Sequence, residues 1–304
     1  MLYRTKAGNR TLYRSRPLLL TPQEAYTRPS PGKAWFATTT SVWRVDEIIK
    51  RSVRDWRRLT GETGHTGERT GTMRADHDSV FTGTHSVFPA PLIEWVLLRY
   101  GGEPGGRMLD AFAGGPPRAL VSTIMGYSYV GFEIRQAQID ENEELLNQLN
   151  LKGHKYILGD GRYLADDIGL FDIGMTCPPY WDLEKYSDHK DDLSNLKTYG
   201  QFNFGMYSTA IAYSKVLRPG AFLCFVVGNF RDKKTGELID FRAHTVENFR
   251  TAGFIFWQEI ILSRNFGSAA QRSTNAWKGK KLVSNHEFLL VFRQPENKKV
   301  EADE

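Results

Sequence analysis

LFDIGM (Leu170–Met175) runs directly into TCPPY (Thr176–Tyr180). The first stretch is short and mostly apolar, which predicts a buried strand. Two prolines follow, and neither has an N–H group with which to continue a strand ladder. The strand is therefore expected to end there, with backbone carbonyls and the Tyr180 ring at the rim of a sheet. In an open α/β sheet ligands bind at that rim, although a Pro-Pro pair on its own more often marks a plain turn.

Strands and helices are predicted to alternate from Phe88 onward. The expected strands are 107–112, 127–134, 156–160, 171–177, 221–227, 254–262 and 287–292. Helices are expected from about residue 90 to Tyr100, from Arg118 to Met125, after Ile134, before Arg218-Pro219-Gly220 and from Ala243 to Thr251. This alternation predicts an α/β fold, Rossmann-like, with a mostly parallel sheet and helices on both faces.

A nucleotide site is predicted where three of these strands end. LDAFAGG (Leu109–Gly115) is a strand followed by a glycine turn and a helix, so the backbone can approach a ligand and the helix can offer free N–H groups. Neither a Walker sequence nor the three-glycine dinucleotide fingerprint is present. Glu133, at the end of the next strand, is placed to bind a ribose. Asp160, at the tip of the third strand, is placed to accept a hydrogen bond from an adenine amino group.

Taken in order, these motifs resemble those of S-adenosylmethionine-dependent DNA amino-methyltransferases of the N4-cytosine and N6-adenine type, including phage-like DNA methylases. The resemblance covers residues 81–293 and implies a seven-stranded methyltransferase sheet, S-adenosyl-L-methionine as cofactor, and no metal. The cofactor-binding residues that it implies, together with those placed above, are Phe88, Pro89, Asp110, Phe112, Gly114, Gly115, Glu133, Ile134, Asp160 and Gly161.

The TCPPY stretch resembles the catalytic tetrapeptide of this family, usually Asp, Asn or Ser followed by Pro-Pro and an aromatic residue. The resemblance implies that Cys177, Pro178, Pro179 and Tyr180 are catalytic. An exocyclic amine is a poor nucleophile because its lone pair is shared with the ring. The Cys177 side chain and the Pro178 carbonyl would accept its two N–H bonds, and Tyr180 would stack on a base flipped out of the duplex.

The sequence departs from the family pattern in the first cofactor motif and in the catalytic tetrapeptide. Ala111 stands where proline is usual, Pro116-Pro117 where small or hydroxyl residues are usual, and Cys177 where Asp, Asn or Ser is usual. A thiol is a weaker acceptor than a carboxylate or hydroxyl. The sequence therefore leaves open whether the target base is cytosine or adenine. N4-methylcytosine is favoured, since cysteine differs by one atom from the serine of cytosine-specific members. A covalent role for Cys177 is not favoured, because ring-carbon methylation uses a cysteine that follows the proline.

Three segments are distinguished along the chain. Residues 1–80 are a basic, aromatic-rich N-terminal extension, 81–294 the methyltransferase domain, and 295–304 a charged tail. Interleaved arginines and aromatics in the extension suit phosphate contacts and base stacking, and packing of these aromatics on the main domain is an equal alternative. Apolar spacing predicts a helix from Val42 to Leu59.

DNA contacts are predicted for the loop at residues 263–286, between the last two strands. Arginine, asparagine and glutamine read base edges, and lysines bind phosphates; the alternative is a solvated loop. The expected DNA-binding residues are Arg264, Asn265, Gln271, Arg272, Lys278, Lys280 and Lys281. An acidic stretch, residues 182–192, follows the tetrapeptide and either closes over the base or caps helices.

Charge and composition limit the partners and the location that are expected. The net charge of +5 favours a polyanion, here double-stranded DNA. No segment is long and apolar enough for a membrane span, and no signal peptide is recognised. Two cysteines fit a reducing compartment, so the expected location is the cytoplasm of a bacterium or a phage-infected host, in a restriction-modification setting. The sequence leaves open whether the protein forms a homodimer. The alternative functions are an RNA or protein-amide N-methyltransferase and a non-catalytic DNA-binding relative.

Overall fold

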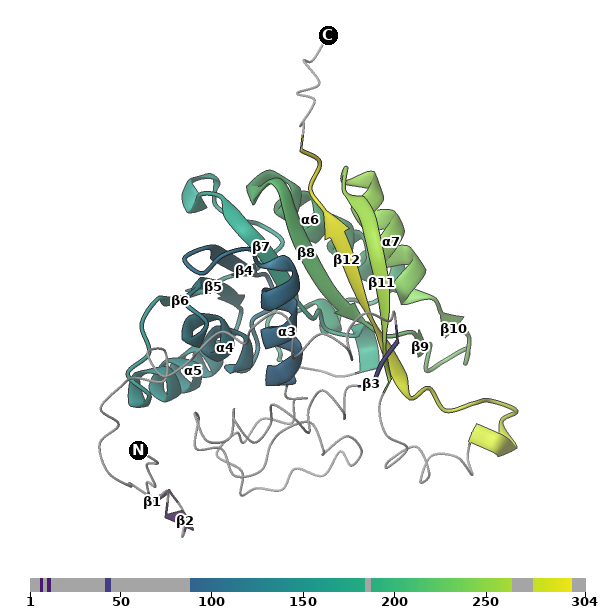
Figure 1. Cartoon of the computed structure of the whole chain (residues 1–304). Coiled ribbons are helices and arrows are strands. Elements are labelled where there is room, and N and C mark those ends of the chain that lie inside the picture. Colours follow the sequence, from purple (N-terminus) through teal and green to yellow (C-terminus); the bar gives the residue numbers. More distant parts are fainter. Residues whose placement is uncertain are drawn as a thin grey trace.

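The computed structural model describes residues 88–183, 187–263 and 276–296, together with three short strands nearer the N-terminus (Figure 1). The strands are β1 Lys6–Ala7, β2 Arg10–Thr11, β3 Val42–Arg44, β4 Arg107–Asp110, β5 Ser128–Glu133, β6 His154–Leu158, β7 Phe171–Thr176, β8 Leu217–Val227, β9 Phe230–Arg231, β10 Leu238–Ile239, β11 Ile255–Ser263 and β12 His286–Arg293. The α-helices are α3 Ala90–Tyr100, α4 Pro117–Ile124, α5 Gln136–Gln148, α6 Tyr199–Val216 and α7 Phe241–Thr251, with short 3-10 turns at η1 Asp166–Ile168, η2 Trp181–Leu183 and η3 Leu193–Asn195.

One eight-stranded sheet organises the described chain, in the order β3-β11-β12-β8-β7-β4-β5-β6. The strands β4 to β8 run parallel, and β12 is antiparallel to both of its neighbours, β8 and β11. The seven strands from β4 to β12 in this sheet confirm the predicted mostly parallel α/β fold. The carboxyl ends of β4, β5, β6 and β7 therefore meet at one edge, which is where ligands bind in sheets of this kind.

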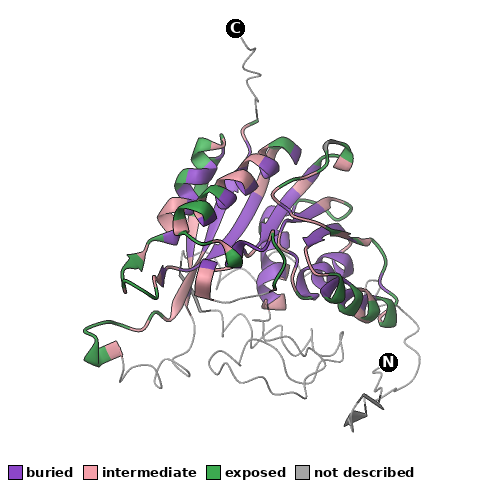
Figure 2. Ribbon diagram, turned by 180° about the vertical axis from the view of Figure 1, so that it is seen from behind, coloured by how far each residue is buried: buried purple, intermediate pink, exposed green. Residues whose placement is uncertain are grey.

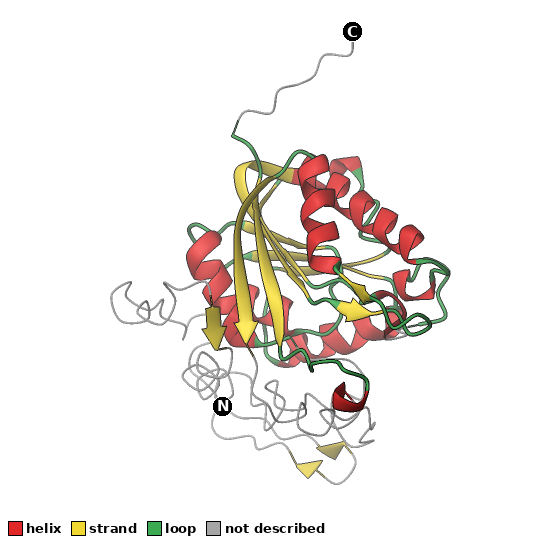
Figure 3. Cartoon of the chain, turned by 90° about the vertical axis from the view of Figure 1, so that its right-hand side faces the viewer, coloured by secondary structure: helices red, strands yellow, loops and turns green. Residues whose placement is uncertain are grey.

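Helices cover both faces of the sheet (Figure 3). The first hydrophobic core contains side chains of α3, α4 and α5, and the second contains side chains of α6 and α7. Because successive strand side chains point to opposite faces, Cys224 and Val226 of β8 belong to the first core, whereas Leu223 and Phe225 belong to the second. Figure 2 shows the result, with buried strands at the centre and exposed residues on the outer sides of the helices.

The segment Arg218-Pro219-Gly220 differs from the prediction. It was expected to separate a helix from a strand that begins at Ala221, but α6 ends at Val216 and β8 begins at Leu217. Phe171 pairs with Leu217 and Ile173 pairs with Phe222, so the intervening residues of β8 form a bulge. Gly220, with φ of +77°, supplies the left-handed residue of this bulge.

The predicted helix from Val42 to Leu59 is wrong at its start. Val42–Arg44 is strand β3, which pairs in parallel with β11 from Ile261 to Ser263 and extends the main sheet. Residues 45–59 lie outside the described part of the chain. One segment of the N-terminal extension is thus an edge strand of the sheet. Among the helices that the structure describes, none combines the length and apolarity that a membrane span requires.

Candidate active site

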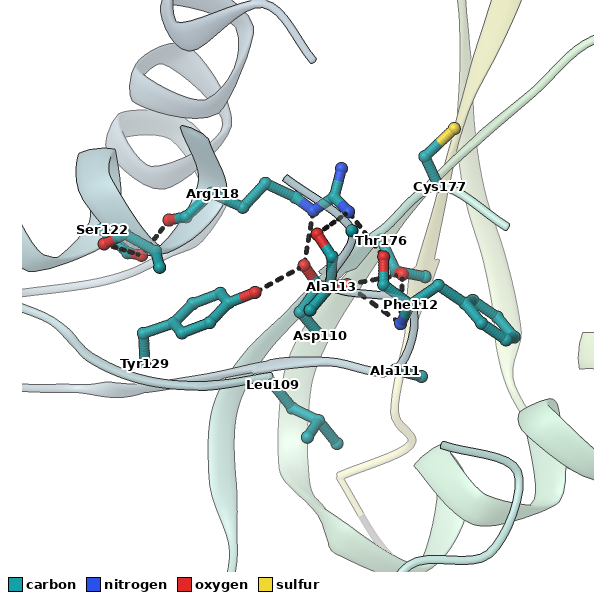
Figure 4. Close-up of polar contacts among 12 residues, drawn as sticks. Leu109, Asp110, Ala111, Phe112, Ala113, Arg118, Ser122, Tyr129, Thr176 and Cys177 are labelled. Carbon is teal, nitrogen blue, oxygen red and sulfur yellow. Dashed lines mark hydrogen bonds and ion pairs between the residues drawn. The ribbon is translucent and has the colours of Figure 1, made fainter. Parts of the chain in front are cut away.

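The ends of β4 and β7 are hydrogen-bonded to each other (Figure 4). Thr176, the last residue of β7, donates from Oγ1 to Oδ1 of Asp110, the last residue of β4, at 2.7 Å. The same Oγ1 accepts from the Phe112 N–H at 3.2 Å. Thr176 and Asp110 are both fully buried. The TCPPY stretch, referred to below as the tetrapeptide segment, therefore starts in direct contact with the glycine turn.

Asp110 is surrounded by protein donors on both oxygens. Oδ1 accepts from Thr176 and from the Phe112 N–H, and Oδ2 accepts from Arg118 Nε at 2.5 Å and from Tyr129 Oη at 2.8 Å. A carboxylate has about four acceptor positions, and all four are used here. The structure thus places Asp110, expected to bind cofactor, as the buried centre that holds the turn in shape.

The glycine turn is fixed through the backbone of Gly114. Its N–H donates to Glu133 Oε2 at 3.1 Å, and its carbonyl accepts from Asn142 Nδ2 at 2.7 Å. Gly114 has φ of +51°, which favours glycine, and a Cβ at this position would meet no atom within 4 Å. Gly115 beside it is exposed. Open space therefore lies next to Gly114.

Glu133 ends β5 beside this turn. Its Oε1 accepts from the Arg135 N–H at 2.9 Å, and 8% of the residue is exposed. Burial raises the pKa of the Glu133 carboxyl, although the hydrogen bond from the Arg135 backbone, the Arg135 charge and the Gly114 N–H oppose the shift. A carboxylate at this place can accept hydrogen bonds from the hydroxyl groups of a ligand that reaches it. The neighbouring Ile134 is half-buried.

The residues that follow β6 form the third part of the site, beside the ends of β4 and β5. Asp160 and Arg162 form an ion pair, in which Arg162 Nε lies 3.0 Å from Oδ1 and 2.8 Å from Oδ2 of Asp160. Gly161 between them packs against the first strand end, because a Cβ there would lie 2.2 Å from the Ala111 carbonyl oxygen. The three predicted ligand-binding strand ends are thus brought together around Ala111–Gly114.

The other residues of the tetrapeptide segment follow Thr176 along the same edge. Cys177 is half-buried, Pro178 is buried, and Pro179 and Tyr180 are half-buried. The Cys177 Sγ atom lies 4.0 Å from the Pro178 carbonyl oxygen, to which the thiol donates a weak hydrogen bond. Burial raises the pKa of the Cys224 thiol, which lies in the core. Of the two cysteines, Cys177 is therefore the one that belongs to the site.

The Tyr180 ring is supported by aromatic side chains. It makes edge-on contacts with Phe230 and Phe241, at centroid distances of 6.4 and 6.1 Å. Its Oη donates to Glu287 Oε1 on β12 at 3.4 Å. These contacts restrain the ring while leaving part of it exposed, which is what a stacking platform for a planar ligand requires.

The acidic stretch, residues 182–192, caps a short turn and contacts the site through Arg162. Asp192 is buried and accepts from Ser194 N at 2.8 Å and from Ser187 Oγ at 2.8 Å, so it caps the turn η3. The Asp191 carbonyl accepts from Arg162 Nη2 at 3.2 Å and links this stretch to Asp160. Capping, one of the two expected roles, is thus confirmed for Asp192. Residues 184–186 lie outside the described part.

Part of the predicted DNA-contact loop is described. Lys278, Lys280 and Lys281 are exposed, and beside them 80% of Trp277 is exposed. The backbone N–H of Lys281 donates to the Ala276 carbonyl at 2.8 Å, which closes a tight turn that presents these side chains. Arg264, Asn265, Gln271 and Arg272 lie outside the described residues. Among the residues that the structure does describe, no group of three or more histidine, cysteine, aspartate or glutamate side chains could hold a metal ion.

Several site residues were missed by the sequence interpretation. Arg118, Tyr129 and Asn142 hold the glycine turn, and Glu287 contacts Tyr180. Arg118 offered a signal, because a single arginine within the otherwise apolar or neutral helix α4 indicates a buried ion pair. Asn142 and Glu287 offered none, since each lies in a segment that contains other polar residues and reaches the site only through the fold.

Comparison with known proteins finds one matching family model. A model of the DNA methylase family matches residues 171–304, which begin at β7 and include the tetrapeptide segment. The match confirms the resemblance to DNA amino-methyltransferases and supports S-adenosyl-L-methionine as the cofactor. A search of curated proteins found no match.

Solved structures that resemble this chain do so at low sequence identity. TrmN from Thermus thermophilus has a TM-score of 0.48 and 13% identity, covering 72% of this chain and 51% of its own. NodS from Bradyrhizobium japonicum WM9, an N-methyltransferase in complex with S-adenosyl-L-homocysteine, has 0.44 and 12%, covering 68% and 86%. A SAM-dependent methyltransferase from Methanosarcina mazei has 0.46 and 16%, covering 66% and 98%. The matched part of this chain thus spans about half the length of TrmN, and resemblances at this level do not indicate a substrate.

Proposed function

We propose that this protein is a DNA methyltransferase that transfers a methyl group from S-adenosyl-L-methionine to the exocyclic amine of a base flipped out of double-stranded DNA. One observation carries the proposal. The Thr176 hydroxyl joins the tetrapeptide segment to the glycine turn through Asp110 and Phe112. A methyl donor at the turn and an amine at the tetrapeptide segment would therefore be held next to each other, and alignment of reactants is the main requirement of this reaction.

The residues around the turn fit the cofactor. Glu133 would accept hydrogen bonds from the ribose hydroxyls, and Asp160 from the adenine amino group. Because the space beside Gly114 is open and Gly115 is exposed, the ligand can come close to the backbone of the turn. Phe88 and Pro89, at the start of α3, would back the methionine part. When bound, the cofactor supplies a methyl group on a positively charged sulfur.

The tetrapeptide segment provides what the amine needs. The Cys177 side chain and the Pro178 carbonyl are acceptors for the two N–H bonds, and a proline ring restricts the direction of that carbonyl. Holding both hydrogens would localise the nitrogen lone pair toward the methyl group. Tyr180, held by Phe230 and Phe241, would stack on the base and offset part of the cost of unstacking it from the duplex.

Cofactor binding is expected to weaken at acid pH because of Glu133. Ribose hydroxyls bind the ionised carboxylate, and its raised pKa means that protonation begins at a higher pH than for an ordinary glutamate. Affinity for S-adenosyl-L-homocysteine should therefore fall as the pH is lowered from about 8 to about 5. Glu133→Gln should weaken binding by about 1–3 kcal/mol near pH 8 and flatten this dependence. Titration calorimetry measures both effects.

The matched control is Glu143→Gln. Glu143 pairs with His154 at the start of β6, at the opposite edge of the sheet. Its replacement should leave affinity and pH dependence unchanged. If the Glu133→Gln protein binds with wild-type affinity, Glu133 does not bind the ribose.

DNA affinity is expected to fall with salt and to depend on the described lysines of the loop. Lys278, Lys280 and Lys281 are exposed on one turn, and each phosphate contact adds about 0.9 to the slope of log affinity against log salt concentration. Replacing all three with glutamine should reduce that slope by up to about 2.7. Replacing the exposed Lys152 and Lys155, at the start of β6, serves as control. Equal slopes for both variants would exclude the loop as a phosphate contact.

A further inference from the structure

The N-terminus of helix α4 lacks two of the backbone N–H groups that usually bind an anion at such a place. Helices bind anions through the free N–H groups of their first turn, but here the N-cap is Pro116 and the first helical residue is Pro117. Neither proline has an N–H. A ligand carboxylate that reaches this helix end therefore meets fewer backbone N–H donors than usual, which makes a side-chain donor more important.

Arg118 follows directly and folds back over the turn. Its Nε donates to Asp110, and its Nη2 donates to the Phe112 carbonyl and, at 2.9 Å, to the Ala113 carbonyl. Asp110 thereby compensates the guanidinium charge. Burial opposes that charge, but Asp110 outweighs it and the pKa of Arg118 is raised, so the side chain keeps all of its protons.

The remaining nitrogen, Nη1, has no hydrogen-bond partner among the described residues. A guanidinium has five N–H donors, and three are used by the contacts above, so the two on Nη1 are left. Only 5% of Arg118 is exposed, but Nη1 itself is not fully enclosed, so a ligand can reach this nitrogen. Figure 4 shows Nη1 directed away from Asp110, without a dashed line.

The surroundings of Nη1 belong to the proposed cofactor site. The Phe88 ring lies over the guanidinium, with its centroid 4.8 Å from Cζ. Phe88 precedes α3 and was expected to back the methionine part of the cofactor. The Cys177 thiol is close enough to interact electrostatically with Arg118. The open donor therefore lies among the glycine turn, the segment before α3 and the tetrapeptide segment.

We propose that Arg118 Nη1 binds the α-carboxylate of the methionine part of S-adenosyl-L-methionine, in place of the helix N–H groups that Pro116 and Pro117 remove. The inference rests on the proposed position of the cofactor at the glycine turn. A carboxylate oxygen would satisfy the two open donors, and a charge-assisted contact of this kind is among the stronger hydrogen bonds in proteins. Arg118 would thus hold the turn with one side of its guanidinium and the ligand with the other.

The test compares S-adenosyl-L-homocysteine with its decarboxylated form, which keeps the adenosine, the thioether and the amine. Calorimetry gives the ratio of the two dissociation constants, and this ratio is insensitive to a general loosening of the turn. The wild-type protein should prefer the carboxylate form about 10- to 100-fold. Arg118→Met should bring the ratio close to 1. Arg107→Met is the control, because Arg107 also binds two backbone carbonyls but lies at the other end of β4.

Loss of Arg118 alone leaves Asp110 buried without its charge partner, so a second pair of variants protects the test against misfolding. Asp110→Asn keeps the guanidinium and should keep the preference. Asp110→Asn combined with Arg118→Met removes the ion pair as a unit and should abolish it. If Arg118→Met or the double variant retains the wild-type ratio, or if Asp110→Asn alone abolishes it, the inference is wrong. If the wild-type protein binds neither ligand, the proposed cofactor site itself is wrong.

Discussion

Replacement of Tyr180 by alanine is expected to remove most of the methyl transfer to DNA. Stacking of a base on an aromatic side chain contributes about 1–3 kcal/mol, so kcat/KM should fall on the order of 10- to 100-fold. Affinity for S-adenosyl-L-homocysteine should stay close to that of the wild type, because Glu133, Gly114 and Asp160 are unchanged. The measurement is the initial rate of label transfer from S-adenosylmethionine to duplex DNA.

Tyr180→Phe separates the ring from the hydroxyl group. The ring keeps its contacts with Phe230 and Phe241 and loses the 3.4 Å hydrogen bond to Glu287. This variant should retain most of the activity. If Tyr180→Phe is as inactive as Tyr180→Ala, the hydroxyl rather than the stacking surface matters, and the role given to Tyr180 is incorrect. Thermal unfolding of all three proteins shows whether the half-buried ring also supports the fold.

Replacement of Asp110 by alanine is expected to have the largest effect on stability. The change leaves Arg118, 5% exposed, with a buried charge and takes the acceptor from Thr176 and Tyr129. Breaking a buried ion pair on one side costs about 3–5 kcal/mol in the free energy of unfolding. Denaturant unfolding followed by circular dichroism measures the loss.

The control for this loss is Arg218→Ala. Arg218 pairs with Asp172 at 3.0 Å, but the side chains are 50% and 34% exposed, and pairs of this kind contribute about 1 kcal/mol or less. Asp110→Asn, which preserves the shape of the side chain, should lie between the two. An Asp110→Ala protein as stable as Arg218→Ala would mean that the buried carboxylate does not hold the turn.

The fold was largely predictable because its signals are local. Apolar strand segments alternate with helices, and Pro117 and the double proline after Cys177 mark where α4 begins and β7 ends. The bulge of β8 was not predictable, because Pro219-Gly220 is an equally good helix terminator and only the pairing of Phe171 with Leu217 reveals the strand. Val42–Arg44 was misassigned for a similar reason, since a segment of only three residues fits the start of a helix and an edge strand alike.

The candidate site was predicted in its positions but not in its contacts. Strand-end residues such as Glu133, Asp160 and Tyr180 are recognisable because parallel strands bring their carboxyl ends to one edge. The partners of these residues come from elsewhere in the chain. Asn142 reaches Gly114 across 28 positions, and Glu287 reaches Tyr180 across 107 positions. Such contacts depend on the packing of α5 and β12, which local sequence patterns do not encode.

The most direct test identifies the product. The protein is incubated with labelled S-adenosylmethionine and double-stranded DNA, the DNA is digested, and the labelled nucleoside is identified, in parallel with a Cys177→Ser protein. An amino-methylated base is expected, with N4-methylcytosine ahead of N6-methyladenine, and Cys177→Ser should keep or raise the yield because a hydroxyl is a better acceptor than a thiol. Label found only as 5-methylcytosine, together with an inactive Cys177→Ser protein, would show that the thiol attacks the ring and would contradict transfer to an exocyclic amine.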